Sequence, residues 1–134
     1  MRYKLIQLVM AMVMTVVLSG CAKRSINGDL DGQWQIMKIE YTDGSVATPE
    51  RTYYCFFLHT INLRSVGGPS IAGNFTYKGD DIKIEFPNGN VENLKLYGIN
   101  GTAVDLKIRA LSSSKMTLQS DYACLLYTSD AADD

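Results

Sequence analysis

The chain has 134 residues, of which 46% are hydrophobic, and its 13 Lys and Arg residues against 14 Asp and Glu residues give a formal net charge of −1 at pH 7. This balance leaves no basic field that would attract nucleic acid, so the composition argues against that class of partner. Residues 22–123 alone have the length of one small domain, since domains usually contain about 50–250 residues.

The start of the chain has the features of an export signal. Arg2 and Lys4 make it basic, and residues 5–17 are apolar almost throughout. A basic start followed by a short apolar run and small residues describes a signal peptide. The apolar run is shorter than the roughly 20 residues that a transmembrane helix needs. We therefore predict a cleaved signal peptide over residues 1–20.

The segment that follows the apolar run, Leu18, Ser19, Gly20 and Cys21, resembles the lipobox of bacterial lipoproteins. The resemblance implies that the Cys21 thiol receives a diacylglyceryl group and that the signal is cut before this residue. It also implies that the new amino group receives an acyl chain such as palmitate. One acyl chain holds a protein only marginally, whereas two or more anchor it stably. The alternative is an ordinary secretory signal with a Cys at this place by chance.

Residues 21–29 are polar and aperiodic, contain Gly28, and are predicted to form a flexible lipidated tether. Ala22 stands where an Asp would retain some lipoproteins at the inner membrane, so the resemblance favours the outer membrane. Lys23 and Arg24 follow, without the acidic cluster that is linked to surface display in some bacteria. We therefore expect a lipid-anchored protein of the bacterial cell envelope, in the outer membrane and facing the periplasm, with surface exposure as the alternative.

Residues 30–123 carry strand patterns separated by turn signals, which predicts an all-β domain. Alternation of apolar and polar residues with a period of two indicates strands with one buried and one solvent-facing side. Several short strands with turn signals between them suggest an antiparallel sandwich or barrel. Residues 91–97 are predicted to form one short helix that ends at Gly98. The strand candidates are residues 35–41, 52–64, 70–77, 82–86, 103–111 and 116–121.

The alternation also predicts which side chains face inward. In the long candidate strand, residues 52–64, Cys55, Phe57 and His59 share one face. A barrel of eight strands can hold one small ligand, and we single out Phe57, Phe75 and Tyr77 as candidate ligand-binding residues. The predicted inward set is bulky enough to fill the interior instead, and it consists of Phe57, Phe75, Ile84, Phe86 and Leu106. The tyrosines predicted to be exposed, and so available to a protein partner, are Tyr53, Tyr54 and Tyr97.

No pattern in the sequence predicts catalysis. Gly-x-Ser-x-Gly, His-Glu-x-x-His, a phosphate-binding loop and Cys-x-x-Cys are all missing from the sequence, so no nucleophile, metal site or phosphate site is indicated. His59 is the single histidine, and Cys55 is predicted to act as a small hydrophobic residue within its strand. We expect no enzymatic activity, no metal and no cofactor other than the lipid groups on Cys21.

Residues 124–134 are interpreted as foreign sequence. Written back into codons, they match the mosaic end and adaptor of transposase-based sequencing libraries over their whole length. We therefore predict an adaptor-derived artefact over residues 124–134 and set it aside from fold reasoning, with a genuine acidic C-terminus as the alternative. On this interpretation the natural chain continues past Ala123 with other residues, and the last strand is missing. A missing strand would leave an open sheet edge.

Gly32, Gln33 and Trp34 match the Gly-x-Trp start of lipocalins. Together with the lipobox, the strand series and residues 118–123, they make the chain resemble the small lipocalin-like lipoproteins of gut anaerobes. The resemblance covers residues 30–123 and implies an antiparallel meander that closes into a small barrel, with Gly32 and Trp34 closing its bottom. The chain differs from true lipocalins in its length, in having no disulfide, and in the missing last strand with its Arg partner for the Trp.

Two functions are compatible with these features. The first is a membrane-tethered barrel that binds a small hydrophobic or lipid-like ligand. The second is a structural, interaction or inhibitor lipoprotein with a filled barrel and no ligand. A cavity large enough for a lipid tail would favour the first function. A packed core with an exposed apolar patch of several hundred Å² would favour the second.

Overall fold

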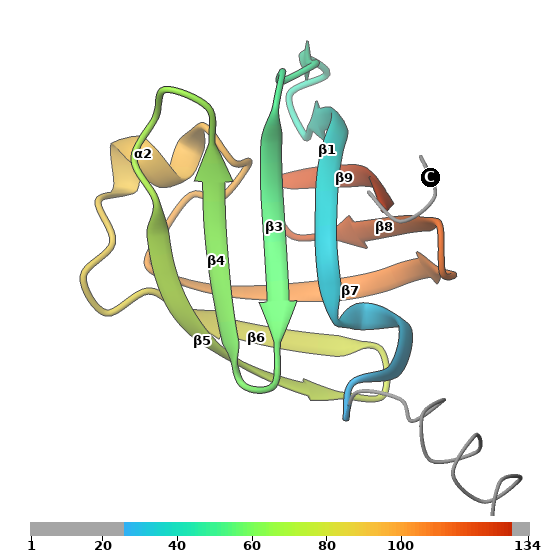
Figure 1. Ribbon diagram of the computed structural model, residues 1–134. Helices are drawn as coiled ribbons and strands as arrows, with labels where there is room; N and C mark the ends of the chain where they lie inside the picture. The colour runs from blue at the N-terminus through green and yellow to red at the C-terminus, as the bar shows by residue number, and fades with distance from the viewer. Residues whose placement is uncertain (1–25, 130–134) are drawn as a thin grey trace, which may run out of the picture.

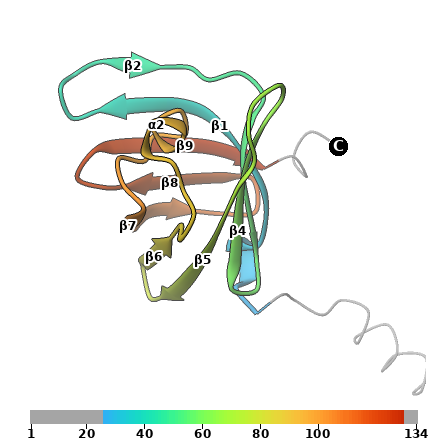
Figure 2. The same cartoon turned by 90° about the vertical axis from the view of Figure 1, so that its left-hand side faces the viewer.

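Alternating apolar and polar residues build nine strands within residues 26–129, the part of the chain that this computed structural model describes. In chain order the elements are η1 (Gly28–Leu30, a single turn of 3-10 helix), β1 (Gly32–Tyr41), β2 (Val46–Ala47), β3 (Thr52–Phe57), β4 (Thr60–Ser65), β5 (Ile71–Lys78), β6 (Asp81–Glu85), α2 (Val91–Lys95), β7 (Ala103–Leu111), β8 (Lys115–Gln119) and β9 (Ala123–Ser129). The strands pair in the order β2-β1-β3-β4-β5-β6-β7-β8-β9, and a further pairing of β1 with β9 closes all of them except β2 into an antiparallel barrel (Figure 1, Figure 2).

Strand β1 is the seam of the barrel because it pairs with three other strands. Its first half pairs with β3, where Trp34 lies opposite Tyr54, and its second half pairs with the short β2. Its other edge pairs with β9 from Trp34 to Tyr41, with a bulge between Ile36 and Lys38. A bulge bends the strand that carries it. The wall therefore closes with β9 held between β1 and β8 rather than exposed as an edge.

The inward-facing side chains form one hydrophobic core inside this wall. The strands β5 and β6 show the strict alternation of buried and exposed residues that the sequence predicted for this hairpin. Within residues 26–129, the all-β class, the closed antiparallel barrel and the short helix after residue 90 are confirmed. The core is made up of Leu30, Trp34, Ile36, Ile39, Tyr54, Phe56, Ile61, Leu63, Ile71, Phe75, Ile82, Ile84, Phe86, Leu94, Tyr97, Ile99, Leu106, Met116, Leu118, Ala123, Leu125 and Tyr127.

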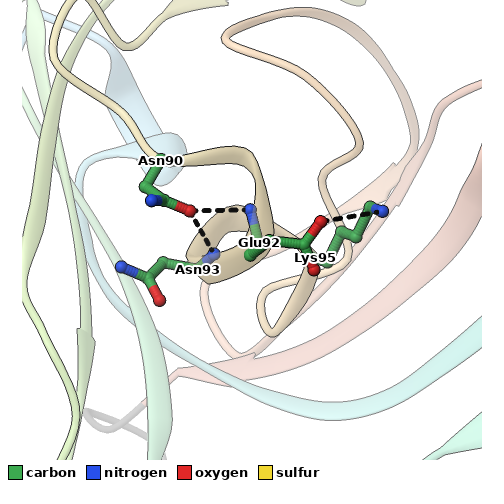
Figure 3. Close-up of polar contacts among 4 residues, drawn as sticks. All are labelled: Asn90, Glu92, Asn93 and Lys95. Carbon is green, nitrogen blue, oxygen red and sulfur yellow. Dashed lines mark hydrogen bonds and ion pairs between the residues drawn. The ribbon is translucent and has the colours of Figure 1, made fainter.

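The short helix α2 forms where the sequence predicted it. Asn90 caps its N-terminus, because the side-chain oxygen of Asn90 accepts hydrogen bonds from the backbone N–H groups of Glu92 and Asn93 (Figure 3). Such caps satisfy backbone donors that have no partner within the helix. Leu94 is buried on the inner side of the helix. The chain leaves the helix through Gly98, whose φ of 80° suits glycine.

The long predicted strand over residues 52–64 is wrong, because the chain reverses in the middle of it. β3 and β4 form a hairpin in which Phe57 pairs with Thr60, and the turn between them consists of Leu58 and His59. Leu58 has a φ of 57°, in the left-handed region. A two-residue turn of this kind usually contains Gly, Asn or Asp. Neither Leu58 nor His59 is one of these, so the turn carries no sequence signal.

β9 is present where we predicted a missing last strand, and that expectation is wrong. Its buried residues Ala123, Leu125 and Tyr127 alternate with half-exposed residues, so the segment fits the place between β1 and β8. The barrel therefore extends to Ser129, beyond the predicted boundary at Ala123. The presence of β9 does not test where the DNA that encodes residues 124–134 came from. The adaptor origin of this segment therefore stays a prediction.

The folded part also begins before Leu30. The Asn27 side chain donates hydrogen bonds to a carboxylate oxygen of Asp31 at 2.6 Å and to the Leu58 carbonyl at 2.8 Å, and η1 follows directly. The end of the predicted tether over residues 21–29 is thus part of the domain. The predicted signal peptide over residues 1–20 lies outside the described residues.

Candidate functional site

The interior of the barrel, where a ligand would be expected, is occupied by aromatic side chains. Tyr54 and Phe56 point inward from β3 and are 0% and 1% exposed. The ring centroid of Phe56 lies 5.2 Å from that of Phe75, and the ring centroid of Tyr54 lies 4.9 Å from that of Tyr127, both in edge-to-face contact. Such distances are those of directly packed rings. The centre of the barrel is therefore filled by its own side chains.

Hydrogen bonds connect this interior to the segment after α2. The Tyr54 hydroxyl donates to the Tyr97 backbone carbonyl at 2.5 Å. The Tyr97 hydroxyl lies 3.2 Å from Ser65 Oγ and 3.1 Å from the Pro69 carbonyl. These bonds join β3, the end of β4 and the segment after α2. Figure 1 shows α2 and the connection from β4 to β5 at the same end of the barrel.

Burial keeps the interior tyrosines neutral. It raises the pKa of Tyr54 and raises the pKa of Tyr127 well above the ordinary value for a tyrosine. The Tyr127 hydroxyl is buried, and its interaction with Tyr54 raises its pKa further. Neutral phenols of this kind can hold hydrogen bonds, and they do not serve as bases near neutral pH.

The three candidate ligand-binding residues do not form one site. Phe57 is 63% exposed, so its predicted inward orientation is wrong. Phe75 is 3% exposed and belongs to the packed core, while Tyr77 is half-buried at the edge of that core. The reason for the error is the turn at Leu58 and His59, which makes Phe56 rather than Phe57 the inward residue.

The predicted barrel-closing residues lie at the start of β1, where the chain enters the wall. Trp34 is 2% exposed, and its indole Nε1 donates a hydrogen bond to the Leu30 carbonyl at 2.9 Å. Gly32 is exposed. The role of both residues in closing the barrel stays a prediction. A hollow of about 410 Å³ lies beside them, lined by Gly28, Asp29, Asp31, Gly32, Gln33, Trp34, Ser113 and Ser129.

A second hollow, of about 390 Å³, lies over β6, β7 and β8 and is lined largely by polar side chains from their outer face. Within it, Lys107 Nζ lies 3.1 Å from a carboxylate oxygen of Asp81. Arg109 Nε donates to the side-chain oxygen of Gln119 at 2.8 Å. Lys107 and Arg109 already have partners on the protein, so neither of them is available to pair with an anionic ligand in this hollow.

The remaining candidates are spread over the surface and the interior. Of the tyrosines predicted to be exposed, Tyr54 and Tyr97 are buried, which corrects that expectation, and Tyr53 is half-exposed. Cys55 is half-exposed on the outer side of β3, with its Sγ 3.8 Å from Gln33 Oε1, rather than within the core. His59 is exposed in its turn.

The described part of the chain places no three His, Cys, Asp or Glu side chains where they could hold a metal ion together. Within residues 26–129, no helix has the length and apolar character needed to cross a membrane. The predicted lipidation site Cys21 and the predicted cleavage motif of Leu18, Ser19 and Gly20 lie outside the described residues.

The sequence model of a family described as "Lipocalin-like domain" matches residues 16–129. Two crystal structures share the fold. A lipocalin-like protein from Bacteroides uniformis has a TM-score of 0.65 and 23% sequence identity, and the match covers 76% of this chain and 99% of that one. An uncharacterized protein from Bacteroides eggerthii has a TM-score of 0.58 and 19% identity over 74% of this chain and 98% of that one. A search of curated proteins found no match.

Proposed function

Because this chain belongs to the lipocalin-like domain family, we propose that it is a lipid-anchored lipoprotein of the bacterial envelope whose barrel acts as a tethered interaction module with a filled interior. The observation that supports the filled interior is the direct packing of the inward-facing rings of Tyr54, Phe56 and Phe75 inside the barrel. Small-molecule sites usually have a preformed apolar cavity of about 300–1,000 Å³. In this barrel the core side chains occupy that place, so a partner would meet the outer wall and the rim.

The anchor is the first part of the proposal, and the sequence from Leu18 to Cys21 supports it. The lipids on Cys21 would hold the protein in the outer membrane, with the domain in the periplasm. The described domain begins only a few residues after Cys21. The partner would therefore be met close to the membrane surface.

A second candidate function is the binding of a small hydrophobic or lipid-like molecule, which the family supports. The hollow of about 410 Å³ beside Trp34 favours it, because this volume falls within the usual range of ligand sites. On this alternative, the ligand binds at the start of β1 beside Trp34 rather than inside the barrel.

The anchor is tested by labelling cells that express the full chain with radioactive palmitate. We expect the label on the wild-type protein and on Cys55→Ser, the matched control, and no label on Cys21→Ser. The Cys21→Ser protein should also move from the membrane fraction to the soluble fraction. An unlabelled wild-type protein, or an unchanged fractionation of Cys21→Ser, would contradict the anchor.

The filled interior is tested with an apolar probe such as xenon or benzene. Packed interiors have few voids larger than a water molecule, whereas an engineered apolar cavity can bind such probes. We expect Phe75→Ala to take up the probe, and the wild type and the exposed-site control Phe57→Ala to take up none. Uptake of one probe molecule by the wild type would contradict the filled barrel and favour a carrier.

A further inference from the structure

One end of the barrel carries an exposed apolar cluster that the core does not explain. We call it the tip cluster, and it consists of Ile26, Phe57 and Leu58, whose exposed fractions are 64%, 63% and 42%. The hydrogen bond from the Asn27 side chain to the Leu58 carbonyl holds the start of the described chain against this turn. Figure 1 and Figure 2 both show the turn between β3 and β4 close to the first described residues.

The backbone of the tip cluster is unusual for such an exposed place. Leu58 adopts a φ of 57°, a conformation that is costly for a bulky side chain and easy for Gly or Asn. A leucine that is both exposed and in this conformation gains nothing from the core. Strained positions of this kind tend to occur where a function requires the side chain.

The length of chain between the anchor and the domain limits where the tip cluster can lie. Five residue steps separate Cys21 from Ile26, and a fully extended chain spans at most about 3.3–3.6 Å per residue, or about 18 Å in all. Lys23 and Arg24 lie within these steps, and basic residues next to a membrane are attracted to anionic headgroups. Any lipid on Cys21 would therefore bring this end of the barrel to the bilayer.

We propose that the tip cluster is a membrane-contact surface, in which Phe57, Leu58 and Ile26 rest in the boundary between headgroups and acyl chains of the bilayer that holds Cys21. This inference rests on the proposed lipidation of Cys21. Apolar side chains next to a lipid anchor bury further apolar area at the bilayer boundary, which adds to the hold of the acyl chains. The exposed carboxylate of Asp29 on η1 keeps the contact shallow. The contact orients the barrel, with α2 and the connection from β4 to β5 facing away from the membrane.

The test uses the full lipidated chain in vesicles of phosphatidylethanolamine and phosphatidylglycerol that carry a brominated lipid, which quenches tryptophan on contact. Phe57→Trp places the reporter at the tip cluster, and Leu96→Trp is the matched control, since Leu96 is 60% exposed after α2 at the other end. Trp34, which is 2% exposed, is present in every variant, so its emission is measured in the wild-type protein and subtracted. On binding to the vesicles, the Phe57→Trp emission should shift to shorter wavelength, and the brominated lipid should quench most of it. The Leu96→Trp emission should be unchanged.

A second variant distinguishes a loss of membrane contact from a loss of folding stability. Leu58→Asn, added to Phe57→Trp, suits the turn and removes an apolar side chain, so the quenching should weaken while the melting temperature holds or rises. Equal quenching at positions 57 and 96, in protein whose lipid is verified by mass spectrometry, would overturn the membrane contact and leave the anchor standing. A protein without lipid on Cys21 would overturn both.

Discussion

Tyr54 links strand β3 to the segment that follows α2. Replacing it by Phe removes the hydroxyl that donates to the Tyr97 carbonyl inside the barrel. A buried acceptor that loses its donor costs about 1–3 kcal/mol. We therefore expect Tyr54→Phe to lower the free energy of unfolding by that amount in urea denaturation. Tyr53→Phe, on the half-exposed side of the same strand, should change it little, and equal effects of the two variants would argue against this bond.

The neighbouring pair Phe56 and Phe57 tests which face of β3 is inside. Phe56 is 1% exposed and Phe57 is 63% exposed. Removing a buried phenylalanine side chain costs about 3–5 kcal/mol, because it leaves a cavity as well as losing burial. We expect Phe56→Ala to lower the free energy of unfolding by about this much. Phe57→Ala should change it by about 0.5 kcal/mol or less. A larger loss of stability from Phe57→Ala than from Phe56→Ala would mean that Phe57 faces inward, as predicted from the sequence.

The error at this pair has a physical cause. Period-two alternation predicts a face correctly only as long as the strand continues. The turn at Leu58 and His59 reverses the chain, and the buried positions change from the even residues Tyr54 and Phe56 to the odd residues Ile61 and Leu63. Neither turn residue is Gly, Asn or Asp, so the sequence carried no signal for the reversal.

The stability of α2 depends on its N-terminal cap, because the helix itself is very short. A helix of five residues is too short to be stable alone. Asn90→Ala removes the oxygen that accepts from two backbone N–H groups, and such a loss typically costs about 1 kcal/mol. Thermal unfolding should show the lower stability. Lys95→Ala removes only the exposed ion pair with Glu92, at 3.4 Å, and should leave the melting temperature nearly unchanged. A larger effect from Lys95→Ala would contradict the role of the cap.

Most of the other elements followed from the sequence, because they carried both a period and a boundary signal. The strand over residues 103–111 and the hairpin around Gly79 were predicted closely, since apolar residues alternate with polar or small ones through most of both segments. A bulge between Ile108 and Ala110 interrupts the pattern near the end of β7. The last strand was lost for a different reason. The foreign origin predicted for residues 124–134 says nothing about their packing, which in β9 depends on the alternation of buried and half-exposed residues. The candidate site was predicted less well than the fold, because a site depends on side-chain direction around turns.

The barrel closes only because β9 pairs with both β1 and β8. A chain that ends at Tyr122 would expose the edges of β1 and β8 and lose Leu125 and Tyr127 from the core. We expect this shorter chain to aggregate and to lose its cooperative thermal transition, since open edges pair with other chains. A chain that ends at Ser129 is the control and should melt as the full chain does. A cooperative transition in the chain that ends at Tyr122 would refute this role of β9.

The protein is expected to combine a lipid anchor on Cys21 with a barrel that holds no small molecule. One native mass spectrum of the protein, extracted gently from the membranes of its own host, tests both parts together. We predict a chain that begins at Cys21, carries the mass of a diacylglyceryl group and one further acyl chain, and has no additional small molecule bound. A chain that keeps its first residues or lacks lipid would contradict the anchor, and a retained ligand in a one-to-one ratio would contradict the filled barrel.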